Sequence, residues 1–330
     1  MTKILTIAIP THNRVNPLRK NIELLLPQIV KCSSDVSLLI SDNCSDDDTQ
    51  SYIESLLLQY ADYISYNRNT EDLGYLRNFG KGVELADSEY VYLLGDDDIV
   101  PPNFVSTIIS ILKDNNDVGI LHFNYLQCDK TTERLSIYNK REFKNFLEYY
   151  DDFSGFVKEF LDIPSFMSSL VFKREVWLKG ELLFEEDCYG YDWLMKVYAG
   201  SLGCKCLYYS MPLMIQTDSG INNYNDVWPL FSIVGKTRIF GHLDSMIPGV
   251  LDIWKKKFNS DLSNYKTILS VALYKGKYKQ YYKEINDILE KKSYNILFKM
   301  SLLFIPSWMC KLFLLPLLEF LRKMLISLRK

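Results

Sequence analysis

Short apolar runs alternate with amphipathic segments through the first third of the chain, and this alternation limits the possible folds more than any other feature. The apolar runs cover residues 4–9, 36–41, 63–67 and 90–94. Helical patterns follow them, at about residues 16–30, within 42–60, at 76–86 and at 102–113. Strands that alternate with helices in this way predict βαβ units and a parallel sheet. We therefore expect an α/β domain with a mostly parallel central sheet.

The remaining chain gives weaker signals. Strands are expected at 168–173 and 205–215, with a helix at 191–200 between them, and helices are expected from residue 226 onward. In the first helix, Asn16 is expected to act as the N-cap and Pro17 to occupy the first helical position.

Each apolar run of the first half ends in a polar cluster. The clusters read "PTHNR", "SDNCSDDD", "NRNTEDLGYLRN" and "GDDD". In open α/β sheets, ligands bind at the carboxyl ends of the strands. The four clusters therefore predict a single binding site at one edge of the sheet.

Three consecutive carboxylates, Asp96, Asp97 and Asp98, follow the run "YVYLLG". Carboxylates packed this closely repel one another unless a cation neutralises them. Mg²⁺ and Mn²⁺ prefer oxygen ligands, and Mg²⁺ is usually held by one or two carboxylates together with substrate phosphates. This pattern predicts a metal that holds a diphosphate. The alternative is a solvated acidic turn in which Asp98 caps the next helix.

Other polar residues of these clusters have nucleotide-binding chemistry. Thr11, Asn13 and Arg14 follow the first strand, where they could hold a nucleotide or serve only in the loop. Asp42 could accept hydrogen bonds from a ribose hydroxyl or a base edge, as acidic residues do in dinucleotide folds, or could be a turn residue.

The third cluster offers a glycine and a cation. Gly74 permits close approach of the backbone to a ligand, and Arg77 could bind a phosphate or form a surface ion pair.

Together, "IAIPTHNR", "LLISDNCSDDDT" and "NRNTEDLGYLRNFGKGVELADSEYVYLLGDDDIVPP" resemble the nucleotide-sugar domain of family 2 glycosyltransferases, which have the GT-A fold. "SFMSSLVFKREVW" and "YYSMPLMIQTDSG" are similar to the abequosyltransferase-type branch, whose members decorate bacterial surface polysaccharides. The resemblance covers about residues 1–225, which we expect to form the catalytic domain.

The resemblance implies site residues. It places Pro10, Thr11, Asn13 and Asp42 at the nucleoside, and the loop around Gly74, with Arg77, near the ribose or diphosphate. It makes the three aspartates the D-x-D region, with Asp97 the principal ligand of Mn²⁺ or Mg²⁺, Asp98 a supporting ligand and Asp96 beside the bound nucleotide. The commonest family pattern is D-x-D-D, and here Gly95 occupies its first position.

An inverting enzyme of this family needs a base that takes the proton of the acceptor hydroxyl. The family carries it at the start of a helix in the second half of the domain, which implies Asp192 in "CYGYDWLMKVYAG", with Asp187 and Glu186 as alternatives. Asp192 is equally suited to be a helix N-cap. Trp193 is expected to stack on a sugar or to pack in the core.

Residues 226–295 are expected to form a helical extension, and residues 296–330 a separate basic and apolar tail. Prolines and charges interrupt the tail, so no run approaches the roughly 20 apolar residues of a spanning helix. A polar stripe lies on one helical face of it, made of Glu319, Arg322, Lys323, Ser327 and Lys330. This pattern predicts an interfacial helix on an anionic membrane, with a core or oligomer helix as the alternative.

Composition excludes other classes of protein. A formal charge of −3 argues against a nucleic-acid binder. Seven scattered cysteines without a C-x-x-C pair argue against a disulfide framework or a zinc site, and favour a reducing cytoplasm. The N-terminus lacks a secretory pattern. We expect a peripheral protein on the inner face of the cell membrane.

The resemblance, taken with these observations, implies a metal-dependent, inverting glycosyltransferase. It would move a sugar from a nucleoside-diphosphate sugar to a saccharide hydroxyl of a lipid-linked O-antigen or capsule intermediate. A Mg²⁺-dependent phosphoryl-transfer enzyme and a non-catalytic, membrane-bound sugar-binding scaffold of the same fold are the alternatives.

Overall fold

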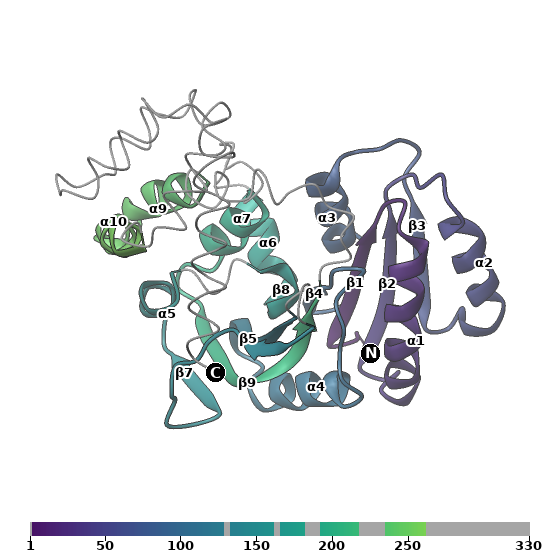
Figure 1. Ribbon diagram of the computed structural model, residues 1–330, viewed down its shortest axis with the longest axis horizontal. Helices are drawn as coiled ribbons and strands as arrows, with labels where there is room; N and C mark the ends of the chain where they lie inside the picture. The colour runs from purple at the N-terminus through teal and green to yellow at the C-terminus, as the bar shows by residue number, and fades with distance from the viewer. Residues whose placement is uncertain (1, 129–132, 162–165, 182–191, 218–234, 262–330) are drawn as a thin grey trace, which may run out of the picture. The chain divides into compact units, whose positions relative to one another are not determined.

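The computed structural model describes residues 2–128, 133–161, 166–181, 192–217 and 235–261 (Figure 1). The chain divides into two compact units. The first comprises residues 1–186 and 192–222 and holds the central sheet, and the second comprises residues 187–191 and 223–330.

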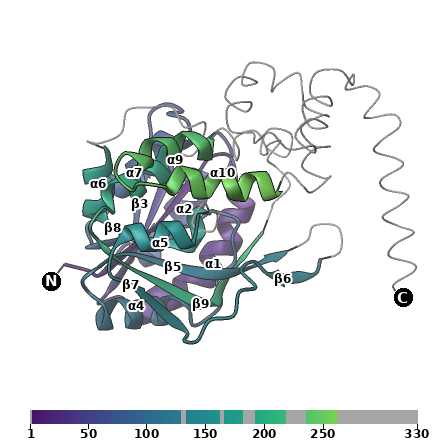
Figure 2. The same ribbon diagram turned by 90° about the vertical axis from the view of Figure 1, so that its left-hand side faces the viewer.

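The sheet of the first unit has the strand order β3-β2-β1-β4-β8-β5-β9-β7, and β6 pairs with β5 at its side. Its described strands are β1 (Leu5–Thr11), β2 (Val36–Asp42), β3 (Ile64–Arg68), β4 (Tyr90–Leu93), β5 (Val118–Cys128), β6 (Leu135–Ile137), β7 (Leu147–Tyr150), β8 (Leu170–Lys173) and β9 (Lys205–Gln216). Figure 2 shows β6 beside the end of β5, and this end of β5 also pairs with β9.

The expected mostly parallel sheet is present only in the first half, and the sheet as a whole is mixed. Strands β3, β2, β1 and β4 are parallel. β8 pairs antiparallel with both β4 and β5, whereas β5 and β9 are parallel and β7 is antiparallel to β9. β5 therefore runs in the same direction as β4, as a helical crossover predicts, but a strand from much later in the chain lies between them. No local pattern in the sequence specifies that insertion.

Helices cover both faces of this sheet (Figure 1). The helices of the first unit are α1 (Val15–Lys31), α2 (Thr49–Tyr60), α3 (Tyr75–Glu84), α4 (Phe104–Asp114), α5 (Phe153–Glu159), α6 (Arg174–Glu181) and α7 (Asp192–Gly200). Ile7 and Ile9 of β1 join a buried cluster with α1 and α4. On the opposite face, Gly82 of α3 lies against Ala8 of β1. Successive side chains of a strand point to opposite faces, so both faces of β1 are buried.

The predicted helix cap Asn16 is wrong, and a second cap that was an alternative is not observed. α1 begins at Val15, one residue before the expected cap Asn16. The carboxylate of Asp47, from the loop after β2, accepts the hydrogen bond of the Val15 backbone N–H at 2.9 Å. The alternative in which Asp98 caps the next helix is not observed, because α4 begins only at Phe104 and the Asp98 side chain is buried elsewhere. In both cases a tertiary contact replaces the local cap.

In the second unit, the structure describes α9 (Lys236–Asp244) and α10 (Val250–Asp261). Phe240 and Trp254 pack with ring centroids 5.3 Å apart, and the Trp254 indole donates a hydrogen bond to Thr237 Oγ1 at 3.1 Å. The predicted tail, residues 296–330, lies outside the described residues. Within the described part of the chain, no helix has the length and apolar content needed to cross a bilayer.

Candidate functional site

The fold brings the predicted polar clusters together at the carboxyl ends of β1, β2 and β4. Thr11 and Asp42 are register partners at the ends of β1 and β2. The Thr11 hydroxyl donates to Asp96 Oδ2 at 2.8 Å across 85 residues of sequence. These three residues therefore lie together at this edge of the sheet, and their forming one binding site stays a prediction.

Asp96 is a buried carboxylate, with 6% of its surface exposed. Burial raises the pKa of Asp96 to about 7, the Arg14 guanidinium opposes that rise, and the neighbouring Asp97 adds to it. Arg14 Nε lies 2.9 Å from Asp96 Oδ1, and its Nη2 contacts Asp97 Oδ2. A charge buried beside a like charge requires a cation, and in this structure Arg14 supplies one.

The Asp98 side chain points into the protein, whereas Asp96 and Asp97 both contact Arg14. Its Oδ2 accepts from the Ser168 hydroxyl at 2.5 Å, and its Oδ1 accepts from the Thr217 backbone N–H at 3.1 Å. Burial raises its pKa well above the usual value, and the Ser168 hydrogen bond opposes that rise. With both oxygens bonded internally, Asp98 ties the loop to Ser168, which precedes β8, and to Thr217, which follows β9. Its predicted role as a metal ligand stays a prediction.

Gly95 explains how this chain departs from the D-x-D-D pattern. A Cβ atom at this position would lie 2.7 Å from Asp98 Oδ2 and 3.3 Å from Ser168 Oγ. The Gly95 N–H donates to Ser168 Oγ at 2.9 Å, and its carbonyl accepts from the Asn21 amide at 2.9 Å. The inward turn of Asp98 therefore leaves no room for a side chain at residue 95.

These carboxylates fit a metal that is shared with substrate phosphates, and they do not form a complete protein cage. Among the described residues, no group of three or more His, Cys, Asp or Glu side chains could hold a metal. Asp97 is partly exposed beside the buried Asp96. One or two carboxylates plus phosphate oxygens is the donor set that Mg²⁺ usually accepts.

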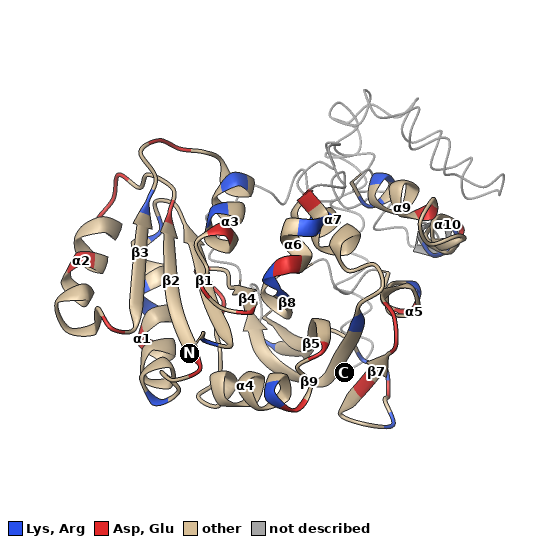
Figure 3. Cartoon of the chain, turned by 180° about the vertical axis from the view of Figure 1, so that it is seen from behind, with Lys and Arg blue, Asp and Glu red and all other residues tan. Residues whose placement is uncertain are grey.

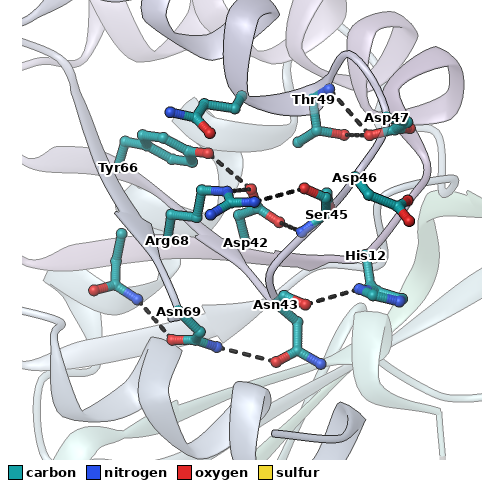
Figure 4. A network of polar contacts seen from close by, with 12 residues as sticks. His12, Asp42, Asn43, Ser45, Asp46, Asp47, Thr49, Tyr66, Arg68 and Asn69 are labelled. Carbon is teal, nitrogen blue, oxygen red and sulfur yellow. Dashed lines mark hydrogen bonds and ion pairs between the residues drawn. The ribbon is translucent and has the colours of Figure 1, made fainter. Parts of the chain in front are cut away.

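Asp42 is fully buried at the end of β2, where it organises the following loop (Figure 4). Its carboxylate accepts from the Tyr66 hydroxyl at 2.7 Å and from the Ser45 N–H at 2.9 Å, and Arg68 Nε lies 3.5 Å away. Burial, together with the Asp42 hydrogen bond, raises the pKa of the Tyr66 phenol. Contact between Asp42 and a nucleoside remains a prediction.

A second network joins the loops after β1, β2 and β3 to the start of α3. His12 Nδ1 lies 2.8 Å from the Asn43 carbonyl, and the Asn69 amide donates to Asn43 Oδ1 at 3.1 Å (Figure 4). Asp72 Oδ1 accepts from the Gly74 N–H at 2.8 Å. Gly74 has φ +76°, a conformation that favours glycine, so it fixes the direction in which α3 leaves the loop.

The remaining nucleotide-site candidates lie around these networks. Pro10 is within β1 and pairs with Ser41 of β2. Asn13 is exposed at φ +54°, and its amide oxygen accepts from the Asp46 N–H at 2.7 Å. Arg77 is exposed on α3 and forms no ion pair with another described residue. Among these residues the geometry leaves Asn13 and Arg77 open to a ligand.

Asp192 is the first residue of α7 and is partly exposed. α7 is held closely against α6, because Gly180 of α6 lies directly against the Lys196 carbonyl of α7. α7 also contacts α3, which begins at the nucleotide-site network. Trp193 is buried, in agreement with the core-packing alternative. Asp187 and Glu186 lie outside the described residues.

Sequence reasoning missed Ser168, Thr217 and Asn21. Two of these residues could have been identified from the family resemblance, because Ser168 lies in "SFMSSLVFKREVW" and Thr217 in "YYSMPLMIQTDSG". These are the two second-half motifs of the resemblance. The structure shows why both belong with the aspartates, since each bonds Asp98.

Comparison with known proteins agrees with this geometry. Residues 6–173 match the family model described as Glycosyl transferase family 2. The chain is 26% identical over 227 residues to Abequosyltransferase RfbV of Salmonella typhimurium (strain LT2), a match covering 64% of this chain and 66% of that protein.

A second relative is the GalNAc(5)-diNAcBac-PP-undecaprenol beta-1,3-glucosyltransferase of Campylobacter jejuni (serotype O:2). It is 34% identical over 107 residues, which cover 32% of this chain and 33% of that protein. Among solved structures, S. aureus TarS 1–349 in complex with UDP-GlcNAc superposes with a TM-score of 0.58 at 12% identity, covering 90% of this chain and 87% of that one.

Proposed function

The chain belongs to glycosyl transferase family 2, among its abequosyltransferase-like members, and we propose that it transfers one sugar to a bacterial surface-polysaccharide intermediate. The donor is a nucleoside-diphosphate sugar and the acceptor is a saccharide hydroxyl on a lipid-linked glycan. The observation that carries this proposal is the convergence of Thr11, Arg14, Asp96 and Asp97 at the strand ends.

In this proposal, each part of the site has a separate task. Pro10, Thr11 and Asn13 line the nucleoside side, and Asp42 keeps the loop beside them in place through Tyr66 and Ser45.

The diphosphate lies beside the aspartate loop. Arg77 on α3 and the backbone at Gly74 contact the phosphates, and Asp97 would hold Mn²⁺ or Mg²⁺. When bound, the ion supplies positive charge that stabilises the departing diphosphate. Asp96 and Arg14 form the charged floor under it. Asp98 acts from behind by fixing the loop to Ser168 and Thr217.

Transfer with inversion is a single displacement. The acceptor hydroxyl oxygen bonds to the anomeric carbon from the face opposite the diphosphate, and the bond from that carbon to the phosphate oxygen breaks. Asp192 takes the hydroxyl proton as the new bond forms. Holding both substrates in this alignment contributes heavily to the rate, because it replaces a bimolecular encounter.

Two observations support a lipid-linked acceptor at the inner face of the cell membrane. The name of the Campylobacter relative gives an undecaprenol-linked substrate for that protein. The sequence at 296–330 combines basic residues with Leu, Ile and Phe, a composition suited to a membrane surface.

The test is a donor panel. Purified protein is incubated with UDP-, GDP-, CDP- and dTDP-linked sugars, with Mn²⁺, with and without a membrane extract containing lipid-linked saccharides. We expect release of one nucleoside diphosphate that depends on both the extract and the ion. Release of inorganic phosphate instead, or no release with any donor, would contradict the proposal.

A further inference from the structure

A concave site of about 540 Å³ lies on the first unit, between the loop after β6, the start of β7 and the middle of β9. Its lining combines cations and apolar side chains, among them Lys140, Arg141, Lys144, Phe143, Phe146 and Met211. We call these six residues the β7 pocket. No residue of the proposed transfer site belongs to it.

The β7 pocket is built on buried anchors. Asn124 of β5 is almost fully buried, its amide donates to the Asn139 carbonyl at 2.9 Å, and its Oδ1 accepts from the Asn139 N–H at 3.1 Å. The Asn139 amide in turn donates to the Tyr208 hydroxyl at 2.9 Å. At the other end of the loop, the Ser210 N–H donates to the Phe146 carbonyl at 2.9 Å. The loop that carries the cations is thus fixed at both ends to β5 and β9.

The charge of the pocket lining has one sign. It contains three cations and no carboxylate. Arg141 is paired with Glu159 at 2.5 Å and lies over the Phe143 ring. Lys140 and Lys144 are exposed and pair with no carboxylate among the described residues. Lys140 and Lys144 therefore line the pocket without an ion-paired carboxylate among the described residues. Figure 3 shows acidic as well as basic residues around β7, outside the pocket lining. An anion is the complementary ligand.

Large apolar side chains are exposed beside these cations. Phe146 is 67% exposed, Met211 45%, and Tyr149 of β7 63%. Binding of a free phosphorylated metabolite would not require exposed apolar side chains around the site. Aromatic and apolar side chains beside lysines are instead typical of proteins that enter a membrane interface.

We propose that the β7 pocket binds the phosphate headgroup of an anionic phospholipid, with Lys140 and Lys144 on the phosphate and Phe146, Tyr149 and Met211 in the interfacial layer. This contact belongs to the catalytic unit itself and is independent of residues 296–330. It depends neither on sugar transfer nor on the metal.

The test measures binding of the full chain to vesicles of phosphatidylglycerol and, separately, of phosphatidylcholine. The double variant Lys140→Gln/Lys144→Gln is compared with Lys20→Gln/Lys31→Gln, which removes the same charge from two exposed positions of α1. A cation at an anionic surface contributes about 5-fold to affinity, so the pocket variant should bind phosphatidylglycerol about 25-fold more weakly. The α1 variant should stay within about 2-fold of the wild type.

Phe146→Ser provides a second, charge-neutral readout. It should weaken binding to phosphatidylglycerol at high salt, where electrostatic attraction is screened and the apolar contact remains. Because Phe146 is largely exposed, the variant should melt like the wild type.

Two results would overturn the proposal. One is equal vesicle binding by the pocket variant and the α1 variant. The other is that soluble glycerol 3-phosphate binds in a Lys140- and Lys144-dependent way while vesicle binding is unchanged, which would assign the pocket to a free phosphorylated ligand. Nucleotide-sugar binding by the same variants is measured in parallel, so that failure of this proposal is distinguished from failure of the proposed transferase activity.

Discussion

At the scale of single residues, Gly95 and Asp98 determine how the aspartate loop is used. The absent side chain at residue 95 lets Asp98 turn inward to Ser168, and this leaves Asp97 as the partly exposed carboxylate of the three. The loop has therefore exchanged the first carboxylate of D-x-D-D for an internal hydrogen bond.

Restoring that carboxylate should lower the free energy of unfolding of the protein. In Gly95→Asp the new Cβ would lie 2.7 Å from Asp98 Oδ2, so Asp98 has to leave Ser168. Overpacking of this kind costs about 1–3 kcal/mol, and a fourth carboxylate in the loop adds repulsion. Urea unfolding should show the loss. Gly241→Ala is the matched control, because nothing lies within 4 Å of its Cβ. A Gly95→Asp variant as stable as the control would refute this account of the loop.

Asp192 has two possible roles at the start of α7, and one substitution separates them. Asn keeps the size of the side chain and caps a helix about as well as Asp, but it cannot take a proton. If Asp192 is the base, Asp192→Asn should lose about 10²–10⁴-fold in kcat with donor affinity and melting temperature nearly unchanged. If Asp192 is only a helix cap, Asp192→Asn should have the turnover and stability of the wild type. Asp192→Ala should then lose about 1 kcal/mol of the free energy of unfolding. Wild-type turnover by Asp192→Asn would move the search to Asp187 and Glu186.

At the scale of elements, β5 and α5 enclose a histidine that should make the fold sensitive to acid. His122 is fully buried against Tyr208, Phe156 and Phe160, and neither ring nitrogen has a hydrogen-bond partner among the described residues. Burial lowers the pKa of His122 to about 3, whereas an unfolded chain binds this proton at about pH 6.5.

The sign of the effect follows from linkage. Between pH 6.5 and about 3 the unfolded state binds the proton and the folded state does not. His122 therefore does not change the free energy of unfolding above pH 6.5, and it lowers this free energy as the pH falls below 6.5. The slope is about 1.4 kcal/mol per pH unit. Urea unfolding of the wild type and His122→Leu at pH 7.5 and pH 5 should show a smaller loss in the variant. Identical losses would mean that the buried ring titrates normally.

Local patterns in the sequence predicted β1 to β4 and α1 to α4, because burial on both faces makes β1, β2 and β4 continuously apolar and their helices are amphipathic. β9 and α7 were also predicted within a residue or two. β6 and β7 were not, since they are short strands with exposed side chains that depend on pairing with β5 and β9. The insertion of β8 between β4 and β5 likewise depends on contacts distant in the sequence.

The candidate site follows the same division. Residues at the strand ends, such as Thr11 and Asp96, were predicted because parallel strands place their carboxyl ends together. Ser168 and Thr217 were not, because they reach Asp98 across 70 and 119 residues. Local pattern identifies which side chains bear the chemistry, and long-range packing decides which of them face a ligand.

At the scale of the whole molecule, the proposed nucleotide-sugar site and the β7 pocket lie on the same compact unit. A glycosyltransferase with a lipid-linked acceptor has to work at a surface, and two separate regions, the pocket and residues 296–330, have compositions suited to one. The central claim is that the strand-end aspartates bind a nucleotide sugar together with a divalent ion.

Calorimetric titration with the donor selected by the panel, with and without Mn²⁺, tests that claim most directly. Wild-type protein should bind the donor more tightly when Mn²⁺ is present. Asp97→Asn should lose this difference, because a neutral amide is a much poorer ligand for a hard dication. Asp117→Asn is the control, since Asp117 is an exposed carboxylate paired with Lys205 at the opposite end of β9. Mn²⁺-dependent donor binding that persists in Asp97→Asn would contradict the account.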